Sequence, residues 1–513
     1  MPTRVLMILL DAADADLIRR WAAEGYLPTF ARLEATAVRA RVENPFGLYV
    51  GAIWPSFYTG VSPARHGRYS FTQLVPGTYR TRAMKRTDVH GTCFWSSLSR
   101  AGRRVAVVDV PKAPPAPEPV NGIMVVDWGL HETEVDGGLW TSPPSLAEAL
   151  AERYGPDPVG VCDLIQGKPD EYARLRERLL RRIDVKARMV RDILEEADWD
   201  FVLAGFAETH CAGHQLWHLH AEAEELAAGS PRVAPPDAMR DVYVAADRAL
   251  GELLEIAGPD TVCLVLASHG FGPYRGGNKI VDDILRAIDG PGSVPGVERR
   301  TMEGLRSIWK RCAPLGMKRA LITVRQRTWH HVQALLLRRE YARRRFFAVP
   351  NNDIYGAIRL NLVGREPHGR VRPEDVERVR DELDRELRSV IDLDTGAPAV
   401  VRVVMASDYY DRQPGDGLPD LFVQWAGARP IVRVQTARGD VVQGYYPDYR
   451  TGDHRDDGGV WITGPGLVGQ ALERPISIMD FAPTIGALLN VALPGLDGRA
   501  VASVTSTHVP STA

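Results

Sequence analysis

The chain has 513 residues, 45% of them hydrophobic and 25% charged, which is the composition of an ordinary globular protein. A formal net charge of -2 argues against a chain whose overall charge attracts nucleic acid or an acidic membrane. The scattered cysteines argue against a disulfide framework, and the sequence has neither a signal peptide nor an apolar run of the roughly 18 residues that span a membrane. We therefore expect a soluble cytoplasmic protein.

The first predicted element is a buried strand over residues 4–10, followed by a helix over residues 14–24. The strand is a continuous aliphatic run, which is typical of a parallel strand buried on both faces. It ends at Asp11, and open α/β sheets bind their ligands at the carboxyl ends of such strands. Asp11 is therefore either a ligand at that end of the sheet or the cap of the helix that follows.

The next segment, residues 45–71, is rich in glycine, proline and aromatic residues, as expected of a loop that wraps a site or a tight core corner. An amphipathic helix is predicted over residues 175–200, and residues 110–120 are predicted to be a proline-rich surface connection. Further buried strands are predicted over residues 104–108, 123–126, 201–206 and 261–267.

Three histidines recur every four residues in the helix predicted after the strand at 201–206. His210, His214 and His218 would share one face of that helix. Two imidazoles one turn apart can bind one metal ion, so the spacing favours a metal site. The alternative is a set of hydrogen-bonded histidines packed beneath Trp217.

Residues 290–349 differ from the rest because helical segments there carry many arginines and lysines. We interpret them as an inserted basic helical cap, and Arg343, Arg344 and Arg345 as candidate binding residues for an anionic substrate. The alternative is an arginine-rich solvated face. No motif supports nucleic-acid binding. After residue 350 we expect the sheet to resume, with strands near residues 355–360 and 419–425.

The ordered motifs resemble the alkaline phosphatase superfamily, in its type I phosphodiesterase/nucleotide pyrophosphatase branch. The resemblance extends from residue 4 to about residue 500. It rests on LLDAADADLIRRWAAEGYLPTFARL, WPSFYTGVSPARHGRYSF, the ETHCAGH helix, the SHG after the strand at 261–267, and the histidine of GDHRDDGG. It implies an α/β fold with a doubly wound, mainly parallel sheet and helices on both faces. The catalytic domain would comprise residues 1–289 and 350–505, interrupted by the cap at 290–349 and followed by a tail at 506–513.

The resemblance also implies a set of metal ligands at Asp11, His210, His214, Ser268, His269 and His454. Three positions depart from the family pattern. Val50 stands where the family has its Thr or Ser nucleophile, and His210 and Ser268 each replace an aspartate. Ser56 and Thr59 are nearby hydroxyls, but neither has the family spacing.

The ligands that remain suggest a chemistry. His210, His214 and His454 would form a three-imidazole site with an open fourth position, while Asp11 and His269 remain for a second ion. The expected cofactor is a divalent metal, zinc before manganese, in one or two copies. We expect hydrolysis of a phosphate ester, a diester or nucleotide-like substrate above others, with metal-bound hydroxide as the attacking group. The ligand side chains should converge within roughly 8 Å.

Two other classes of function stay open. One is a sulfuric or phosphonic ester hydrolase, or a phosphotransferase, on the same scaffold. A sulfatase would need Cys or Ser in a C/S-x-P-x-R motif, which residues 50–54 lack. The other is a non-catalytic descendant that binds an anionic ligand or a partner, which loss of the nucleophile and two acidic ligands would favour. Oligomeric state cannot be deduced from these patterns.

Overall fold

The computed structural model describes residues 3–506, except for 131–136, 163–167, 221–236, 278–279, 290–339, 352–353, 413–415, 427–428 and 445–449, and except for the side chains of residues 49, 50 and 169. Its main element is a 10-stranded sheet, here called the large sheet. In spatial order the strands are β20 (Gln470–Ala471), β2 (Val38–Glu43), β19 (Gly458–Thr463), β9 (Thr261–Ala267), β1 (Arg4–Leu10), β8 (Phe201–Phe206), β5 (Val105–Val108), β6 (Gly122–Val126) and β7 (Trp140–Ser142), with β21 (Ile476–Ser477) beside β2.

The centre of the large sheet is parallel, as the sequence predicts. Strands β9, β1, β8, β5 and β6 pair in parallel, and β19 and β7 are antiparallel to their neighbours β9 and β6. Alternate residues of β1 belong to different cores: Leu6 and Ile8 to one, Met7 and Leu9 to the other. This alternation shows that the sheet is buried on both faces.

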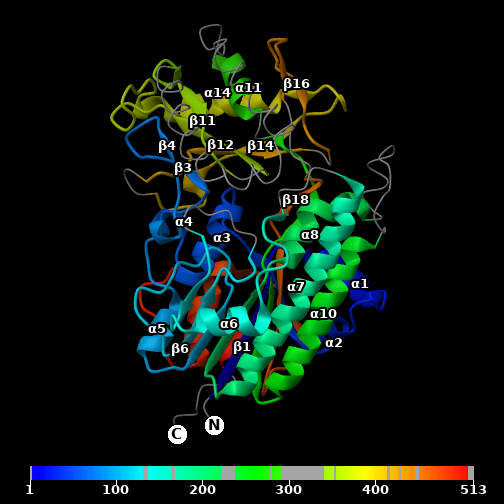
Figure 1. Ribbon diagram of the computed structural model, residues 1–513. Coiled ribbons are helices and arrows are strands. Elements are labelled where there is room, and N and C mark those ends of the chain that lie inside the picture. The colour runs from blue at the N-terminus through cyan, green and yellow to red at the C-terminus, as the bar shows by residue number, and fades with distance from the viewer. Residues whose placement is uncertain are drawn as a thin grey trace.

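Helices cover the two faces of the large sheet (Figure 1). One face packs against α1 (Ala15–Ala23), α2 (Pro28–Thr36), α6 (Leu146–Tyr154), α7 (Pro169–Glu196), α8 (Glu208–Leu216) and α10 (Ala238–Ala257). The other packs against α3 (Tyr49–Thr59), α5 (Phe94–Arg100), α15 (Phe481–Leu488) and α16 (Ala502–Thr505). The short helix α4 (Pro63–His66) follows α3. The predicted doubly wound α/β fold is therefore confirmed.

A second core, here called the small unit, is built from residues 280–289, 346–405 and 421–442. Its main sheet is antiparallel, in the order β11 (Phe346–Ala348), β12 (Tyr355–Leu360), β15 (Leu421–Trp425) and β14 (Val400–Met405). A three-stranded sheet, β13 (Ile391–Asp392), β16 (Arg433–Gln435) and β17 (Val441–Gln443), and the helices α11 (Val281–Asp289) and α14 (Val376–Arg388) complete it.

The small unit corrects the prediction that the large sheet resumes after residue 350. The strands expected near residues 355–360 and 419–425 exist as β12 and β15, but they pair with each other in the small unit. The reason for the error is physical: β12 is buried at every position, like a central parallel strand, and its sequence does not reveal its partner. Among the described strands after residue 350, only β19, β20 and β21 return to the large sheet. Most of the expected cap, residues 290–339, lies outside the described residues.

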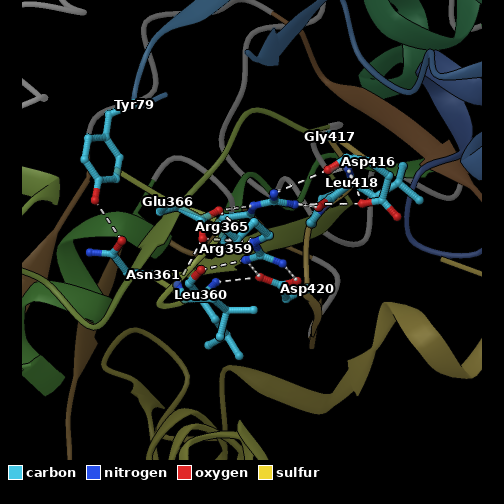
Figure 2. A network of polar contacts seen from close by, with 12 residues as sticks. Tyr79, Arg359, Leu360, Asn361, Arg365, Glu366, Asp416, Gly417, Leu418 and Asp420 are labelled. Atoms are coloured by element: carbon cyan, nitrogen blue, oxygen red, sulfur yellow. Dashed lines mark hydrogen bonds and ion pairs between the residues drawn. The ribbon is translucent and has the colours of Figure 1, made fainter. Parts of the chain in front are cut away.

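Polar side chains of the small unit and of the adjoining residues Arg412, Asp416 and Asp420 form a buried ionic network, here counted with the small unit (Figure 2). Arg359 pairs with Glu366 at 2.9 Å, and Arg365 pairs with Glu366 at 2.8 Å and with Asp420 at 2.6 Å. Arg412 pairs with Asp420 at 2.7 Å and with Asp416 at 2.5 Å. The backbone N–H of Leu360 also donates to Asp420, at 2.7 Å. Three cations therefore meet three anions, and the network connects β12 with the segment that leads into β15.

Two short ribbons complete the structure, β3 (Thr72–Leu74) with β4 (Thr81–Ala83), and β10 (Gly270–Pro273) with β18 (Gly452–Arg455). The second ribbon positions the site described next. Strand β10 follows β9 directly, and β18 precedes β19, so the ribbon stands at the carboxyl end of β9. Figure 1 shows β18 and α8 at the end of the large sheet that faces the small unit.

Candidate metal centre

The first two residues of the site lie on α8, which begins directly after β8 and is buried along its whole length. His210 and His214 lie one turn apart, with ring centroids 4.6 Å from each other. His218 does not continue this face, because the α-helix gives way to a tighter turn at Trp217–Leu219. Its Nδ1 lies 3.1 Å from the hydroxyl of Thr451. Two of the three regularly spaced histidines therefore meet at the site.

The third residue, His454, comes from β18, where it is paired with Phe271 of β10. Its ring centroid is 4.6 Å from that of His214 and 5.2 Å from that of His210. Ligating atoms of the three histidines all lie within 4.8 Å of one another. Among the described residues, this is the one group of three or more His, Cys, Asp or Glu side chains with the geometry to hold a metal ion.

Two glycines allow α8, β10 and β18 to approach so closely. A Cβ on Gly213 would lie 2.4 Å from the ring of Phe271, and one on Gly452 would lie 2.1 Å from the carbonyl oxygen of Gly213. Neither position can accept a larger residue without moving its neighbours. The backbone of Thr451 donates a further hydrogen bond, 2.9 Å long, to the carbonyl of His214. The ribbon is thus fixed directly against the helix that carries the other two imidazoles.

A hydrogen bond sets the tautomer of His214. Its Nδ1 lies 3.0 Å from the carbonyl oxygen of Gly452. A carbonyl oxygen only accepts, so Nδ1 carries the proton and the lone pair is on Nε2. Histidines that bind metals have this arrangement, with one nitrogen on the ion and the other donating to a carbonyl or carboxylate. Three imidazoles, buried and close together, suit a divalent cation such as zinc.

Ser268 and His269 lie directly behind His454, at the end of β9. The Nε2 of His269 is 2.9 Å from the Nδ1 of His454, and its Nδ1 is 2.9 Å from the hydroxyl of Ser268. Burial, and then the charge of Lys112, lowers the pKa of His269 to about 3. Burial, followed by the neighbouring His214 and His269, lowers the pKa of His454 well below its usual value. Both imidazoles are neutral at pH 7 and can offer lone pairs.

Asp11 lies between α8 and Ser268. The hydroxyl of Thr209 donates to the backbone carbonyl of Asp11 at 2.7 Å, and the next N–H along the chain, from Ala12, donates to the hydroxyl of Ser268 at 3.0 Å. The capping role that the sequence left open belongs to Asp14, whose side chain accepts from the N–H of Leu17. The buried carboxylate of Asp11 does not belong to the group of three clustered histidines.

A buried ionic network fixes the start of α8. Glu208 accepts from the Nε of Arg182 at 2.7 Å and lies 3.5 Å from the ammonium of Lys186. Lys186 also pairs with Asp109 at 3.1 Å and donates to the carbonyl of Gly205 at 3.1 Å. Arg182 and Lys186 both come from α7, so this helix holds the α8 segment that presents His210 and His214. In this network the cations of α7 are paired with the carboxylates of Glu208 and Asp109, so its role is to stabilise the fold.

The hydroxyls considered as nucleophiles lie on α3. Ser56 Oγ is 3.0 Å from Nε2 of His66, whose Nδ1 accepts from the backbone N–H of Arg68. The proton of His66 is therefore on Nε2, which donates to the hydroxyl oxygen of Ser56. His66 in this state cannot accept the hydroxyl proton of Ser56. Thr59 donates to the carbonyl of Pro55 at 2.5 Å and lines a separate pocket of about 400 Å³ that includes none of the clustered histidines. Val50 lies in the first turn of α3, and the direction of its side chain lies outside what the structure describes.

The three arginines proposed to bind substrate have different surroundings. Arg344 is buried and pairs with Asp282 at 2.8 Å and with Glu340 at 3.3 Å. Arg345 is partly exposed and pairs with Asp289 at 2.9 Å and with Glu382 at 2.8 Å. Arg343 is exposed. Arg344 and Arg345 are thus committed to carboxylates of the small unit, which leaves Arg343 as the most accessible of the three.

Lys112 is a charged residue near the site that the sequence analysis did not single out. The prediction of a surface connection at 110–120 is wrong for residues 110–113, which are buried. The ammonium of Lys112 lies 3.8 Å from the centroid of the Phe71 ring, and its charge reaches both His269 and His454. An isolated lysine in a proline-rich stretch carries no periodic signal that could have revealed this position.

Left-handed backbone conformations gather at the same end of the sheet. Four of the five described non-glycine residues with positive φ follow strands β1, β5 and β6, namely Ala12, Asp109, Lys112 and Asp127. Such conformations cost roughly 1–3 kcal/mol each and cluster at functional sites. Their position after β1, β5 and β6 therefore agrees with a functional site at the carboxyl ends of the parallel strands.

The doubly wound sheet, with metal-type ligands after β8 and β9 and on the ribbon beside them, defines an α/β protein of the alkaline phosphatase superfamily. The family model described as type I phosphodiesterase / nucleotide pyrophosphatase matches residues 5–426. The chain therefore belongs to this family of phosphohydrolases.

Solved structures agree on the fold. Phosphonoacetate hydrolase from Sinorhizobium meliloti 1021, in complex with phosphonoformate, is 14% identical, with 96% of each chain covered and a TM-score of 0.51. Murine ectonucleotide pyrophosphatase / phosphodiesterase 5 is 11% identical, with 97% of each chain covered and a TM-score of 0.50. At these identities the likeness is one of fold alone. No curated protein matches the sequence. Among the described helices, none has the length and apolarity to cross a membrane.

Proposed function

We propose that the protein is a metal-dependent hydrolase of phosphate esters, acting on diesters or nucleotide-like substrates. The observation that carries this proposal is the group formed by His210, His214 and His454 at the carboxyl end of the large sheet. The expected ion is zinc, with manganese as the alternative. His210, His214 and His454 would hold this ion, and when bound it would supply Lewis-acid chemistry and lower the pKa of water toward about 7, so that attack by hydroxide would become possible at neutral pH.

The protein's own groups support this chemistry in three ways. The carbonyl of Gly452 fixes the tautomer of His214, so that Nε2 is available as a ligand. The ammonium of Lys112 supplies positive charge beside the imidazoles, as an anionic ester requires. The His66 contact leaves Ser56 without a base, which favours attack by water over a covalent route.

The decisive experiment is to measure the metal content of purified protein together with hydrolysis of bis(p-nitrophenyl) phosphate, p-nitrophenyl phosphate and p-nitrophenyl sulfate. We expect bound metal, preference for the diester, activity at neutral pH and inhibition by a chelator that added zinc reverses. Preference for the sulfate would support the sulfatase alternative. Absence of both metal and hydrolysis after addition of zinc or manganese would support the non-catalytic alternative.

A cytoplasmic location is also part of the proposal. In the described part of the chain, Cys93 and Cys263 are buried free thiols. Free thiols suit a reducing compartment. Determining the thiol content and the location of the protein in its own cells would test this point.

A further inference from the structure

We infer that His269 is a positioning residue for the metal ligand His454 and that the centre holds a single metal ion. The inference rests on the proposed metal-dependent function. It differs from the arrangement that the family resemblance implies, in which Asp11 and His269 would serve a second ion. The carrying observation is that both ring nitrogens of His269 already have hydrogen-bond partners within the protein, Ser268 on one side and His454 on the other.

The proton positions follow from the role of His454. If its Nε2 binds the ion, the neutral imidazole carries its proton on Nδ1. This nitrogen lies 2.9 Å from the Nε2 of His269, so it donates and the Nε2 of His269 accepts. The proton of His269 is then on Nδ1, which donates to the hydroxyl oxygen of Ser268 at 2.9 Å. In this state the lone pair of Nε2 is used by His454 and Nδ1 carries a proton, so His269 has no lone pair for a second ion.

Ser268 is suited to complete this chain of hydrogen bonds. Its oxygen accepts from the backbone N–H of Ala12 at 3.0 Å as well as from His269, which uses both lone pairs of a hydroxyl. Ala12 itself has a left-handed backbone conformation, with a φ of 54°. Ser268 therefore orients His269, whereas an aspartate at this position would bind a metal ion. Such outer hydrogen bonds hold the ligand ring and raise its basicity.

The arrangement of the other ligands agrees with one ion. Among the described residues, the group with ligating geometry contains the three histidines and neither Asp11 nor His269. His214 and His454 then have equivalent support: each presents one nitrogen to the ion and donates from the other, His214 to the Gly452 carbonyl and His454 to His269. Ser268 and His269, which the family resemblance implies as ligands, thus support the ligand His454 instead.

The test is the metal stoichiometry of the full-length protein, measured by elemental analysis after equilibration with zinc and removal of excess metal. We expect one zinc per chain in the wild-type protein. Two zinc ions per chain would overturn the inference and leave the proposed function intact, whereas no bound zinc would overturn both. His90→Ala, which removes an exposed histidine outside this hydrogen-bond chain, should leave the stoichiometry unchanged and controls for adventitious binding.

Two substitutions of His269 separate positioning from ligation. The amide of His269→Gln reaches the position of Nε2 and can still accept from His454. The shorter amide of His269→Asn reaches only the position of Nδ1 and can still contact Ser268. We expect both variants to bind one zinc, His269→Asn with affinity lowered about 10- to 100-fold and His269→Gln close to wild type.

The visible absorption of the cobalt-substituted proteins is the second readout, and it does not depend on activity. The spectrum of wild type and His269→Gln should show the same four-coordinate bands, and that of His269→Asn should be shifted or broadened because the His454 ring is less constrained. A decrease from two ions to one in His269→Asn would show that His269 is a ligand and would overturn the inference. Circular dichroism identifies any variant that fails to fold, and the wild-type stoichiometry tests the inference without a variant.

Discussion

The imidazole cluster of the large sheet and the ionic network of the small unit are both buried and polar, yet their composition differs. The network of Figure 2 contains three arginines and three carboxylates, and each cation lies within 2.9 Å of an anion. The cluster gathers side chains of one kind: the ring of His454 faces His214, His269 and Phe271, with centroids between 4.6 and 4.7 Å away.

The difference shows how to distinguish a structural cluster from a binding cluster. Hydrogen bonds and the charge of Arg365, with the charges of Arg359 and Arg412, outweigh the effect of burial on Asp420 and lower its pKa, so the network stabilises the charged forms within itself. In the cluster, burial and neighbouring histidines lower the pKa of His454, so the neutral form is favoured and one ring nitrogen keeps its lone pair. In the network, protein side chains supply both the cations and the anions. The cluster consists of neutral imidazoles, so it is suited to binding an added cation.

The largest effect that would test this comparison is expected at His210. His210→Ala should lose metal and turnover together, because two imidazoles hold an ion much less firmly than three. The ion's transition-state stabilisation of several kcal/mol corresponds to a loss of roughly a thousandfold or more in kcat/KM for a diester. Metal content and kinetics should be measured on the same preparation, with His90→Ala as the control. Wild-type turnover by a metal-free variant would refute the role of the cluster.

The network should respond in stability instead of activity. Asp420→Asn leaves Arg365 and Arg412 without their shared carboxylate and should lower the free energy of unfolding by about 3–5 kcal/mol. Asp394→Asn is the matched control in the same unit, since it breaks only the exposed pair with Arg433 and should cost about 1 kcal/mol or less. Urea denaturation gives both values. Loss of bound metal in folded Asp420→Asn would contradict the separation of the two regions.

Acid should affect the buried histidines and the ionic network in different pH ranges. Burial, with the charges of Arg68 and His90, lowers the pKa of His66 to about 3, and that of His269 is also about 3. An unfolded chain protonates these imidazoles near pH 6.5, so the free energy of unfolding of the metal-free protein should fall as pH decreases from about 6.5 toward 3. The slope is up to about 1.4 kcal/mol per pH unit for each imidazole.

Asp420 acts over a lower range. Its folded pKa is below the usual value of 3.8, so its contribution to stability is present above that value and is lost only as pH falls further. Urea denaturation at pH 7, 6 and 5 should therefore show a slope that His66→Gln reduces and Asp420→Asn leaves unchanged. A free energy of unfolding that stays constant over this range would show that these imidazoles are not held neutral.

The hydroxyls of α3 should matter much less. Ser56→Ala removes one hydrogen bond with His66 and should cost about 1 kcal/mol of stability while keeping most of the turnover. Thr59→Ala should also keep most of the turnover, and Val50→Thr should not reduce it. Diester kinetics and metal content check all three variants. If either alanine variant lost turnover with its metal intact, a covalent route through that hydroxyl would replace attack by water.

The smallest effect is expected at Arg343. Reversing the charges of Arg343, Arg344 and Arg345 together would also break the ion pairs of Arg344 and Arg345 in the small unit. Arg343 should therefore be substituted alone. Arg343→Glu should change stability by no more than about 0.5 kcal/mol and should raise KM for an anionic ester at low salt. The effect should disappear at high salt. An unchanged KM at low ionic strength would assign Arg343 to the solvated face.

The sequence predicted the large sheet well because its strands are continuous buried runs that alternate with helices. It also brought His210, His214 and His454 together as candidates, since the family motifs occur in the right order. It could not reveal that Lys112 is buried, because a single lysine among prolines has no pattern. It could not assign carboxylate partners to Arg344 and Arg345, since Asp282 and Asp289 lie about 60 positions away. Hydrogen-bond partners such as His269 and His454 are set by β18, whose register only the fold defines.

The late position of β18 and β19 in the chain has a consequence for biosynthesis. His454 follows His214 by 240 positions (454 − 214), and β19 fills the place between β9 and β2. While the polypeptide is being made, β9 and β2 emerge from the ribosome long before the strand that joins them. Open strand edges of this kind promote aggregation, so the nascent chain carries this hazard until β19 is made. An ion that needs all three histidines can be acquired only once residues 452–463 have left the exit tunnel.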